Sequence, residues 1–115
     1  MRFDLSVNEF VYDAFTKKSL EIYDPDTWRP YCHVLDFARA VHMIFESSNS
    51  YTSYEVYNVG NEKLNYSKED VCNIIKSKVP GYIYFSEIGE DKDKRDYVVS
   101  YKKISKTGFK LQYSI

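Results

Sequence analysis

The sequence contains few of the residues that mark specialised sites or processing signals. Its two cysteines, Cys32 and Cys72, form no Cys-x-x-Cys motif and are predicted to be buried, reduced thiols. The four glycines are scattered at positions 60, 81, 89 and 108, which excludes a Gly-rich phosphate loop. There is no signal peptide and no apolar run near the roughly 20 residues that span a bilayer. We therefore expect a soluble, cytoplasmic protein that does not act at a membrane.

An excess of one charge is also absent. The 16 Lys and Arg residues nearly balance 17 Asp and Glu residues, so the sequence has no basic field to support nucleic-acid binding. His33 and His42 match no metal-ligand spacing and are interpreted as structural. No tyrosine is followed four positions later by lysine, and there is no Gly-x-Ser-x-Gly elbow. The sequence therefore predicts no metal site and no self-contained catalytic site.

What the chain does have is apolar and aromatic content. Its 115 residues are 43% hydrophobic, which is enough for one domain over residues 1–115 with a modest core. Twelve tyrosines are unusually many for this length. A tyrosine side chain has an apolar ring and a polar hydroxyl. The tyrosines therefore suit a surface that binds polar, ring-shaped ligands or a partner domain. The alternative is that many of them are half-buried residues of strands.

Apolar periodicity predicts an α/β chain of short strands and three main helices. The three helices begin after Asp4, Asp36 and Ser67, which are expected to act as N-caps, and a small last helix is expected at 101–107. Short strands are predicted at 20–23, 31–34, 54–60 and 82–86, with an extended segment at 97–100 and a turn in "DPDTW". This pattern lacks the long βαβ series of a complete nucleotide-binding domain.

Arg29 is the most informative charged residue. Pro30 follows it and restricts its backbone to the extended region, so the guanidinium projects from a stiff position. Arginine suits bidentate contact with phosphate. The alternative is an ion pair with Asp24 or Asp26 in the preceding turn, and spacing alone leaves both interpretations open.

Two further polar positions have a functional and a structural interpretation. Asn65 precedes a capped helix, where its amide would meet a phosphate or ribose hydroxyl or would bond to the loop backbone. The stretch from Glu90 to Asp96 alternates charges, as solvated loops commonly do, and Arg95 is its only arginine.

Four stretches resemble the extended short-chain dehydrogenases/reductases, the NAD(P)-dependent nucleotide-sugar epimerases and dehydratases. "RPYCHVLDFARA" is similar to their Arg-x-aromatic-x-x-Val-x-Asp-x-Ala-x-Ala segment, and "LEIYDPDTW" to their L-x-I-Y-G strand and turn, with Asp24 where Gly is common. "YEVYNVG" and "DKRDYVVSYKKISKTGF" resemble their later strand and closing segment. The order and spacing agree over nearly all of the chain.

The resemblance implies the C-terminal, substrate-binding part of such an enzyme, apparently a fragment. The Rossmann domain that binds NAD or NADP and carries the catalytic Tyr-x-x-x-Lys would lie in a missing N-terminal part. Carried over by position, Arg29 would grip the nucleotide diphosphate, Tyr23 and Glu21 would line the base or sugar, and Asn65 would lie near the phosphate. A late family arginine falls on Glu90 here, which makes Arg95 the available substitute.

Two hypotheses about function follow from the sequence, beside the third possibility of a purely structural domain with no ligand. The first is that the chain binds a nucleotide-diphosphate sugar for a parent epimerase or dehydratase and is inactive alone. The second is that it is a non-catalytic binding or interaction module that retains the fold. Separated from a Rossmann domain, it would expose Tyr- and Phe-rich surface and self-associate, with a homodimer as one form.

Overall fold

The computed structural model describes residues 5–47, 52–86, 88–92 and 94–115. These residues form two compact units. Unit 1 comprises residues 1–29 and 66–97, and unit 2 comprises residues 30–65 and 98–115. The chain therefore passes from one unit to the other three times, and each unit is described separately below.

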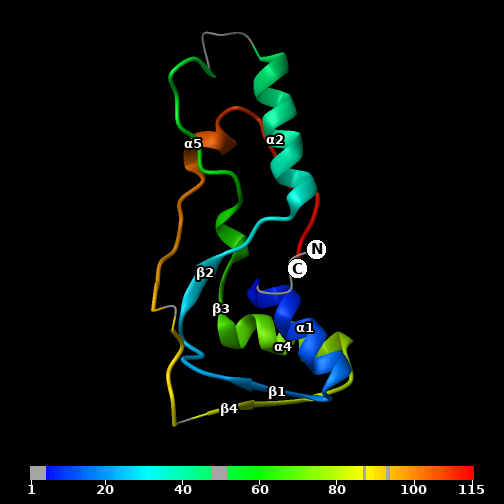
Figure 1. The fold of residues 1–115 in the computed structure, drawn as a ribbon. Coiled ribbons are helices and arrows are strands. Elements are labelled where there is room, and N and C mark those ends of the chain that lie inside the picture. The colour runs from blue at the N-terminus through cyan, green and yellow to red at the C-terminus, as the bar shows by residue number, and fades with distance from the viewer. Residues whose placement is uncertain (1–4, 48–51, 87, 93) are drawn as a thin grey trace. The chain divides into compact units, whose positions relative to one another are not determined.

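Unit 1 is built on two parallel strands covered by two helices. β1 (Ser19–Ile22) pairs with β4 (Tyr82–Phe85) in a register that places Ser19 opposite Tyr82. α1 (Ser6–Thr16) and α4 (Lys68–Lys78) contact these strands and each other, and lie on one face of the pair (Figure 1). The predicted strands at 20–23 and 82–86 are thus confirmed within one residue.

The core of unit 1 lies between this strand pair and the helices. Alternation along β1 buries Leu20 and Ile22, which pack with Cys72 of α4. Partly buried Phe10 and Ile83 pack against this cluster. The prediction that Cys72 is a buried thiol is therefore confirmed.

The start of α4 follows the sequence prediction closely. The Ser67 hydroxyl accepts from the Asp70 backbone N–H, and the Asp70 carboxylate accepts from the Ser67 backbone N–H, which completes a capping box. The helix ends at Lys78, before Pro80 and Gly81. Lys76 and Lys78 in its last turn are favourable at the negative end of the helix dipole.

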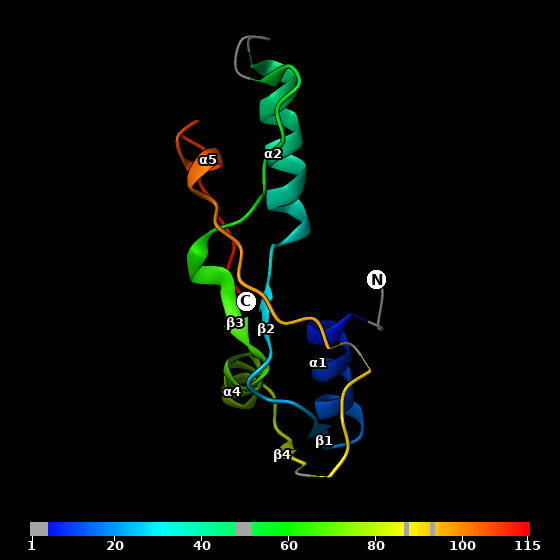
Figure 2. The same cartoon turned by 90° about the vertical axis from the view of Figure 1, so that its left-hand side faces the viewer.

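Unit 2 is organised around α2 (Val34–Glu46), with η1 (Glu62–Leu64) and α5 (Lys102–Ser105). Ala40 of α2 packs with Tyr101 and Ile104, so α5 and the C-terminal segment lie beside α2 (Figure 2). Four partly buried hydrophobic residues surround this cluster: Tyr57, Val59, Val99 and Phe109. The small side chain of Ala40 lets α5 approach the helix closely.

A buried carboxylate fastens the C-terminal segment to α2. Asp36 is fully buried and accepts hydrogen bonds from the backbone amides of Gln112 (3.0 Å) and Tyr113 (3.0 Å) and from Arg39 (2.6 Å). Burial by itself raises the pKa of Asp36, but the two amides and the guanidinium outweigh it and leave the pKa below its usual value.

Two short strands carry the chain across the boundary between the units. β2 (Trp28–Pro30) pairs with β3 (Asn65–Ser67), and the boundary falls within each of them. Together the elements make a small mixed α/β fold of short strands, with four α-helices in the part of the chain that the structure describes. That agrees with the fold class expected from the sequence.

Several local predictions were wrong. Residues 31–34 form no strand, because β2 ends at Pro30 and α2 already begins at Val34. The cap of α2 is His33, whose Nδ1 accepts from the Leu35 amide, while Asp36 lies in the first turn. Residues 54–60 form no strand; within this segment the Asn58 side chain donates to the Ser100 carbonyl.

Two further expectations concern Cys32 and the N-terminus. Cys32 is exposed, not buried, because it lies in the irregular link between β2 and α2. Phe37 and Val41 of α2 are also exposed. The predicted cap at Asp4 lies outside the described residues. Among the described residues, no helix is long and apolar enough to cross a membrane.

Candidate functional site

The candidate site in unit 1 begins with the turn between β1 and β2. The Thr27 amide donates to the Asp24 carbonyl (3.2 Å), which closes the predicted turn with Pro25 at its second position. Asp24 has φ 51°, in the left-handed region that non-glycine residues seldom adopt. This is the position at which the resembling family commonly has glycine, so the backbone here has the conformation that such a residue would favour.

The start of α4 holds this turn in place. The amides of Lys68 and Glu69, which lack partners inside the helix, donate to the carbonyls of Thr27 and Pro25 at 3.1 Å each. The side chain of Lys68 is buried; its Nζ donates to the Tyr23 carbonyl (2.9 Å) and pairs with Asp91. The turn that precedes Arg29 is therefore fixed by backbone and charged contacts together.

Tyr23 and Glu21, predicted to line a base or sugar, lie close together. They are two residues apart at the end of β1, and their side chains are hydrogen-bonded, with Glu21 accepting. This bond, with smaller effects of burial and of nearby charge, raises the pKa of Tyr23. The Tyr23 ring also lies against Gly89, where an added Cβ would come within 2.6 Å of it.

Arg29 itself lies in β2 and is half-buried. Its guanidinium donates to the Trp28 carbonyl (3.0 Å) and lies over the Tyr97 ring, 5.6 Å from the ring centroid. The backbone of Trp28 is held on both sides, because its amide donates to the Asp96 carboxylate (2.9 Å) and its carbonyl accepts from the Tyr97 amide (3.3 Å). The position of Arg29 is thus set by residues 68 positions further along the chain.

Asp24, one of the two acids that the sequence offered as an ion-pair partner of Arg29, accepts a backbone hydrogen bond from the charged loop. The Asp24 carboxylate accepts from the Asp91 backbone amide (2.8 Å), which ties the turn to the charged loop. Arg95, the predicted substitute for the late family arginine, is exposed on that loop, directly before the Asp96 that bonds to Trp28. The loop segment that contains Arg95 therefore lies against β2 at Trp28, the residue directly before Arg29.

Asn65 belongs to unit 2, whereas the other four predicted site residues belong to unit 1. Its Nδ2 donates to the carbonyls of Glu62 (3.2 Å) and Val99 (3.0 Å), and its Oδ1 accepts from the Val99 amide (3.1 Å). The Asn65 side chain therefore joins η1 to the segment before α5. Bonding to the loop backbone is one of the two interpretations that the sequence allowed for Asn65. A ligand-binding role for Asn65 stays a prediction.

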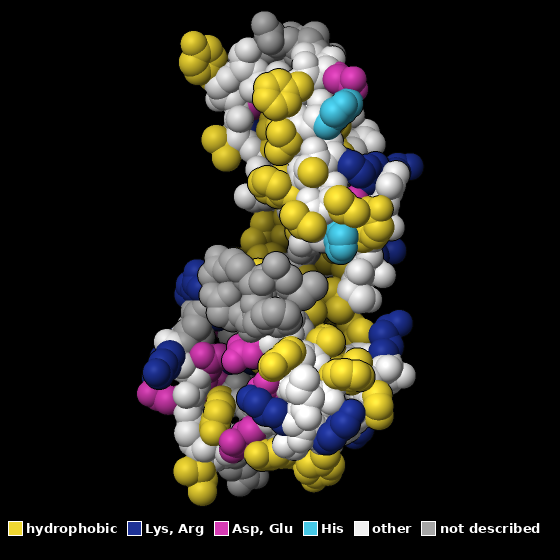
Figure 3. Space-filling view, turned by 45° about the vertical axis from the view of Figure 1, so that its right-hand side comes forward, with side chains coloured by type: hydrophobic (Ala, Val, Ile, Leu, Met, Phe, Trp, Pro, Cys, Tyr) yellow, Lys and Arg dark blue, Asp and Glu magenta, His cyan; other side chains and the backbone are white. Residues whose placement is uncertain are grey.

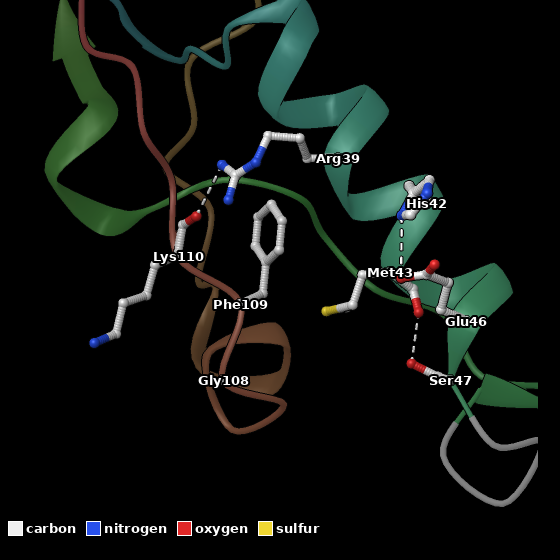
Figure 4. A pocket seen from close by; sticks show the side chains of 8 residues that line it. All are labelled: Arg39, His42, Met43, Glu46, Ser47, Gly108, Phe109 and Lys110. Atoms are coloured by element: carbon white, nitrogen blue, oxygen red, sulfur yellow. Dashed lines mark hydrogen bonds and ion pairs between the residues drawn. The ribbon is translucent and has the colours of Figure 1, made fainter.

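Unit 2 also contains a depression that the sequence did not indicate. It has a volume of about 490 Å³ and lies between the second half of α2 and residues 108–110 (Figure 4). Its walls include the Phe109 ring, over which the Arg39 guanidinium lies, and the His42–Glu46 pair at 3.3 Å. Arg39 pairs with the buried Asp36 outside the depression, and its guanidinium also donates to the Lys110 carbonyl (3.2 Å).

Residues 6–60 match the sequence model of the NAD dependent epimerase/dehydratase family. The matched stretch runs from the first residue of α1 to the end of the segment before η1, and contains Glu21, Tyr23 and Arg29. It excludes Asn65 and Arg95. The match supports a relationship to a family of NAD-dependent, sugar-modifying enzymes, and it covers the turn whose left-handed Asp24 is described above.

The residues that fix Arg29 were not identified from the sequence. The β1–β2 turn and β2 are held by four residues from distant parts of the chain: Lys68, Asp91, Asp96 and Tyr97. The closing "DKRDYVVSYKK" segment, which resembles the family, contains two of these four. Spacing could not show that this segment lies against β2.

Proposed function

We propose that this chain is the substrate-binding part of an NAD(P)-dependent epimerase or dehydratase, that its substrate is a nucleotide-diphosphate sugar, and that the chain is inactive alone. The observation that carries the proposal is the fixed position of Arg29 within the stretch that matches the family. The turn before Arg29 supports the same assignment, because Asp24 has the left-handed backbone conformation at the position where the resembling family commonly has glycine.

A diphosphate is the ligand that suits Arg29 best. A guanidinium has five N–H donors in a planar fork, so one can bond to the Trp28 carbonyl while others bind two phosphate oxygens. The Tyr97 ring supports the guanidinium from one face. Because the backbone at Trp28 is fixed by Asp96 and Tyr97, little conformational entropy is lost on binding.

The neighbouring residues suit the nucleoside and sugar. The Glu21 carboxylate accepts from Tyr23 and has further lone pairs to accept sugar hydroxyls. The Tyr23 ring offers an apolar face and a hydroxyl, and the exposed Arg95 offers a second cation for the phosphates. In this proposal the chain holds the sugar in the orientation that the reaction of the parent enzyme requires, and this positioning is its contribution to the rate of that reaction.

The residues present do not suit the dinucleotide cofactor. A Gly-rich loop lets the cofactor pyrophosphate approach the backbone. At Gly60, Gly81 and Gly89 that space is already filled, because a Cβ added at each would lie only 2.4–2.8 Å from the nearest neighbouring atom. Gly108 is open but follows the end of α5. We therefore place NAD(P), which would supply hydride transfer, and the catalytic Tyr-x-x-x-Lys in a separate Rossmann part of the parent enzyme, which would be the partner of this chain.

Calorimetric titration of the 115-residue chain with UDP, UMP and inorganic pyrophosphate tests the proposal. UDP should bind most tightly, and Arg29→Ala should weaken it by about tenfold to a hundredfold, since a hydrogen bond to a charged group contributes about 1.5–3 kcal/mol. Arg29→Lys should fall between, because lysine keeps the charge without the fork. Lys17→Ala removes an exposed cation from the same unit and should have no effect.

The outcomes separate the proposal from its rivals. Equal affinity for pyrophosphate and UDP would mean that the nucleoside is not recognised. UDP binding that Arg29→Ala leaves unchanged would contradict the site and would favour a non-catalytic module that binds elsewhere. If none of the three ligands binds, the nucleotide-binding function itself is contradicted.

A further inference from the structure

The charged side chain of Lys68 has an unusual position in unit 1. Lys68 is only 5% exposed and is the first residue of α4, where the positive end of the helix dipole disfavours another positive charge. Burial of a charged group is also strongly unfavourable unless partners compensate it. By contrast, Figure 3 shows charged side chains of both signs at the surface of unit 1. A buried lysine at this position indicates a role beyond the helix itself.

Two contacts compensate the buried charge, and both lie at the proposed site. The Lys68 Nζ donates to the Tyr23 carbonyl (2.9 Å) and pairs with the Asp91 carboxylate. The Asp91 amide in turn donates to the Asp24 carboxylate (2.8 Å). Residues 89–91, which we call the loop start, are thus attached to the end of β1 through both the side chain and the backbone of Asp91.

The loop start lies against the ring of Tyr23. Gly89 has φ 114°, and a Cβ added to it would come within 2.6 Å of the ring. The Tyr23 hydroxyl is hydrogen-bonded to Glu21. Tyr23 is therefore held at three points: its ring by the Gly89 backbone, its hydroxyl by Glu21 and its carbonyl by Lys68.

We propose that Lys68 is a positioning residue for the nucleoside and acts through Tyr23. The inference rests on the proposed function, in which Tyr23 and Glu21 line the nucleoside and sugar. By pairing with Asp91, Lys68 keeps the loop start against the Tyr23 ring, so the ring is already ordered before a ligand binds. The Lys68 Nζ itself is covered by its two partners and does not contact the ligand.

This role separates recognition of the nucleoside from recognition of the diphosphate. The contacts of Arg29 with Trp28 and Tyr97 do not involve the Lys68 side chain. Loss of the Lys68–Asp91 pair should therefore weaken binding of the nucleoside and leave the diphosphate contact in place. Inorganic pyrophosphate has no nucleoside, so its affinity reports on the diphosphate contact alone.

Calorimetric titration of the 115-residue chain with UDP and with inorganic pyrophosphate tests the proposal. Lys68→Met should raise the Kd for UDP about three- to tenfold, the range expected when one more side chain has to be ordered on binding, and leave the Kd for pyrophosphate unchanged. Asp91→Asn, which breaks the pair at a carboxylate that is 35% exposed, should do the same. Lys76→Met is the matched control, because Lys76 is exposed on the same helix, and it should change neither Kd.

A double-mutant cycle tests whether Lys68 acts through Tyr23. In a Tyr23→Ala background, Lys68→Met should cause no further loss of UDP affinity, whereas a general loss of structure would still add to it. Circular dichroism checks that each variant is folded. If Lys68→Met does not fold, Asp91→Asn supplies the same comparisons from the loop side.

The outcomes distinguish this proposal from the proposed function. A Kd for UDP that neither Lys68→Met nor Asp91→Asn changes would overturn the positioning role and leave the proposed function standing, because Arg29→Ala tests that function separately. Equal losses for UDP and pyrophosphate, or a further loss in the Tyr23→Ala background, would show that Lys68 only stabilises unit 1. A wild-type chain that binds neither ligand would overturn both proposals.

Discussion

The carboxylate of Asp36 should be the most important single polar group for the stability of unit 2. It is fully buried and accepts from the backbone amides of Gln112 and Tyr113 and from Arg39. Asp36→Asn keeps the shape but replaces one acceptor oxygen with an NH₂ group that faces other donors. A hydrogen bond to a charged group contributes about 1.5–3 kcal/mol, and Arg39 is partly solvated, so we expect a loss of about 2–4 kcal/mol.

The pH dependence of the same contact has a defined sign. Because the pKa of Asp36 is lower in the folded chain than in the unfolded chain, its contribution is fully present above the unfolded value of about 3.9. That contribution is lost as the pH falls through the lower, folded value. The stability difference between the wild type and Asp36→Asn should therefore be constant near neutral pH and shrink in acid.

Two measurements check this prediction. Urea unfolding followed by circular dichroism gives the change in unfolding free energy, and hydrogen exchange by NMR gives the protection of the Gln112 and Tyr113 amides. Glu90→Gln is the control, because the Glu90–Lys94 pair is exposed and should contribute little. If Asp36→Asn unfolds like the wild type and both amides stay protected, the carboxylate does not hold the C-terminal segment.

Three further predictions follow from individual contacts. Gly60→Ala should destabilise unit 2 by about 1–3 kcal/mol in thermal unfolding, because its Cβ would come within 2.4 Å of the buried Tyr101 ring; an unchanged melting temperature would contradict that packing. Asp24→Gly and Asp24→Val both lose the bond to the Asp91 amide, but the valine variant should be less stable than the glycine variant by about 1–2 kcal/mol because only valine is strained at this positive φ; equal stabilities of the two variants would contradict a left-handed backbone at residue 24. A thiol reagent at pH 8 should label exposed Cys32 and spare Cys72, whose pKa burial raises to about 11, until the chain unfolds; rapid labelling of both would refute this.

Local signals in the sequence predicted local structure well. The Ser67–Asp70 capping box, the turn at Asp24 and the start and end of α4 depend on residues a few positions apart, and all agree with the structure. The strands at residues 31–34 and 54–60 failed for a different reason. Alternation of apolar residues indicates extended backbone, but a strand also needs a continuous ladder with a neighbour; in the described residues neither segment belongs to a sheet, and residues 31–34 have only the single bond from the Tyr31 amide to the Leu64 carbonyl.

The candidate site could be predicted only in part for the same reason. Pro30 and the surrounding motif singled out Arg29, but the residues that hold it, Trp28, Asp96 and Tyr97, depend on a contact across 68 positions. The sequence also did not show which side of α2 is buried. An apolar row indicates a buried face without saying what covers it, and in this chain the inward side belongs to Ala40 and Asp36.

An amide chemical-shift map of the ¹⁵N-labelled chain titrated with UDP tests the nucleotide-diphosphate site at Arg29 most sharply. Saturable shifts are expected in the β1–β2 turn, at Tyr23, Trp28 and Arg29, and at Tyr97 on the facing segment, and Arg29→Ala should abolish them. Shifts confined to the depression around residues 43–47 and 108–110, or no shifts at all, would contradict a nucleotide-diphosphate site at Arg29.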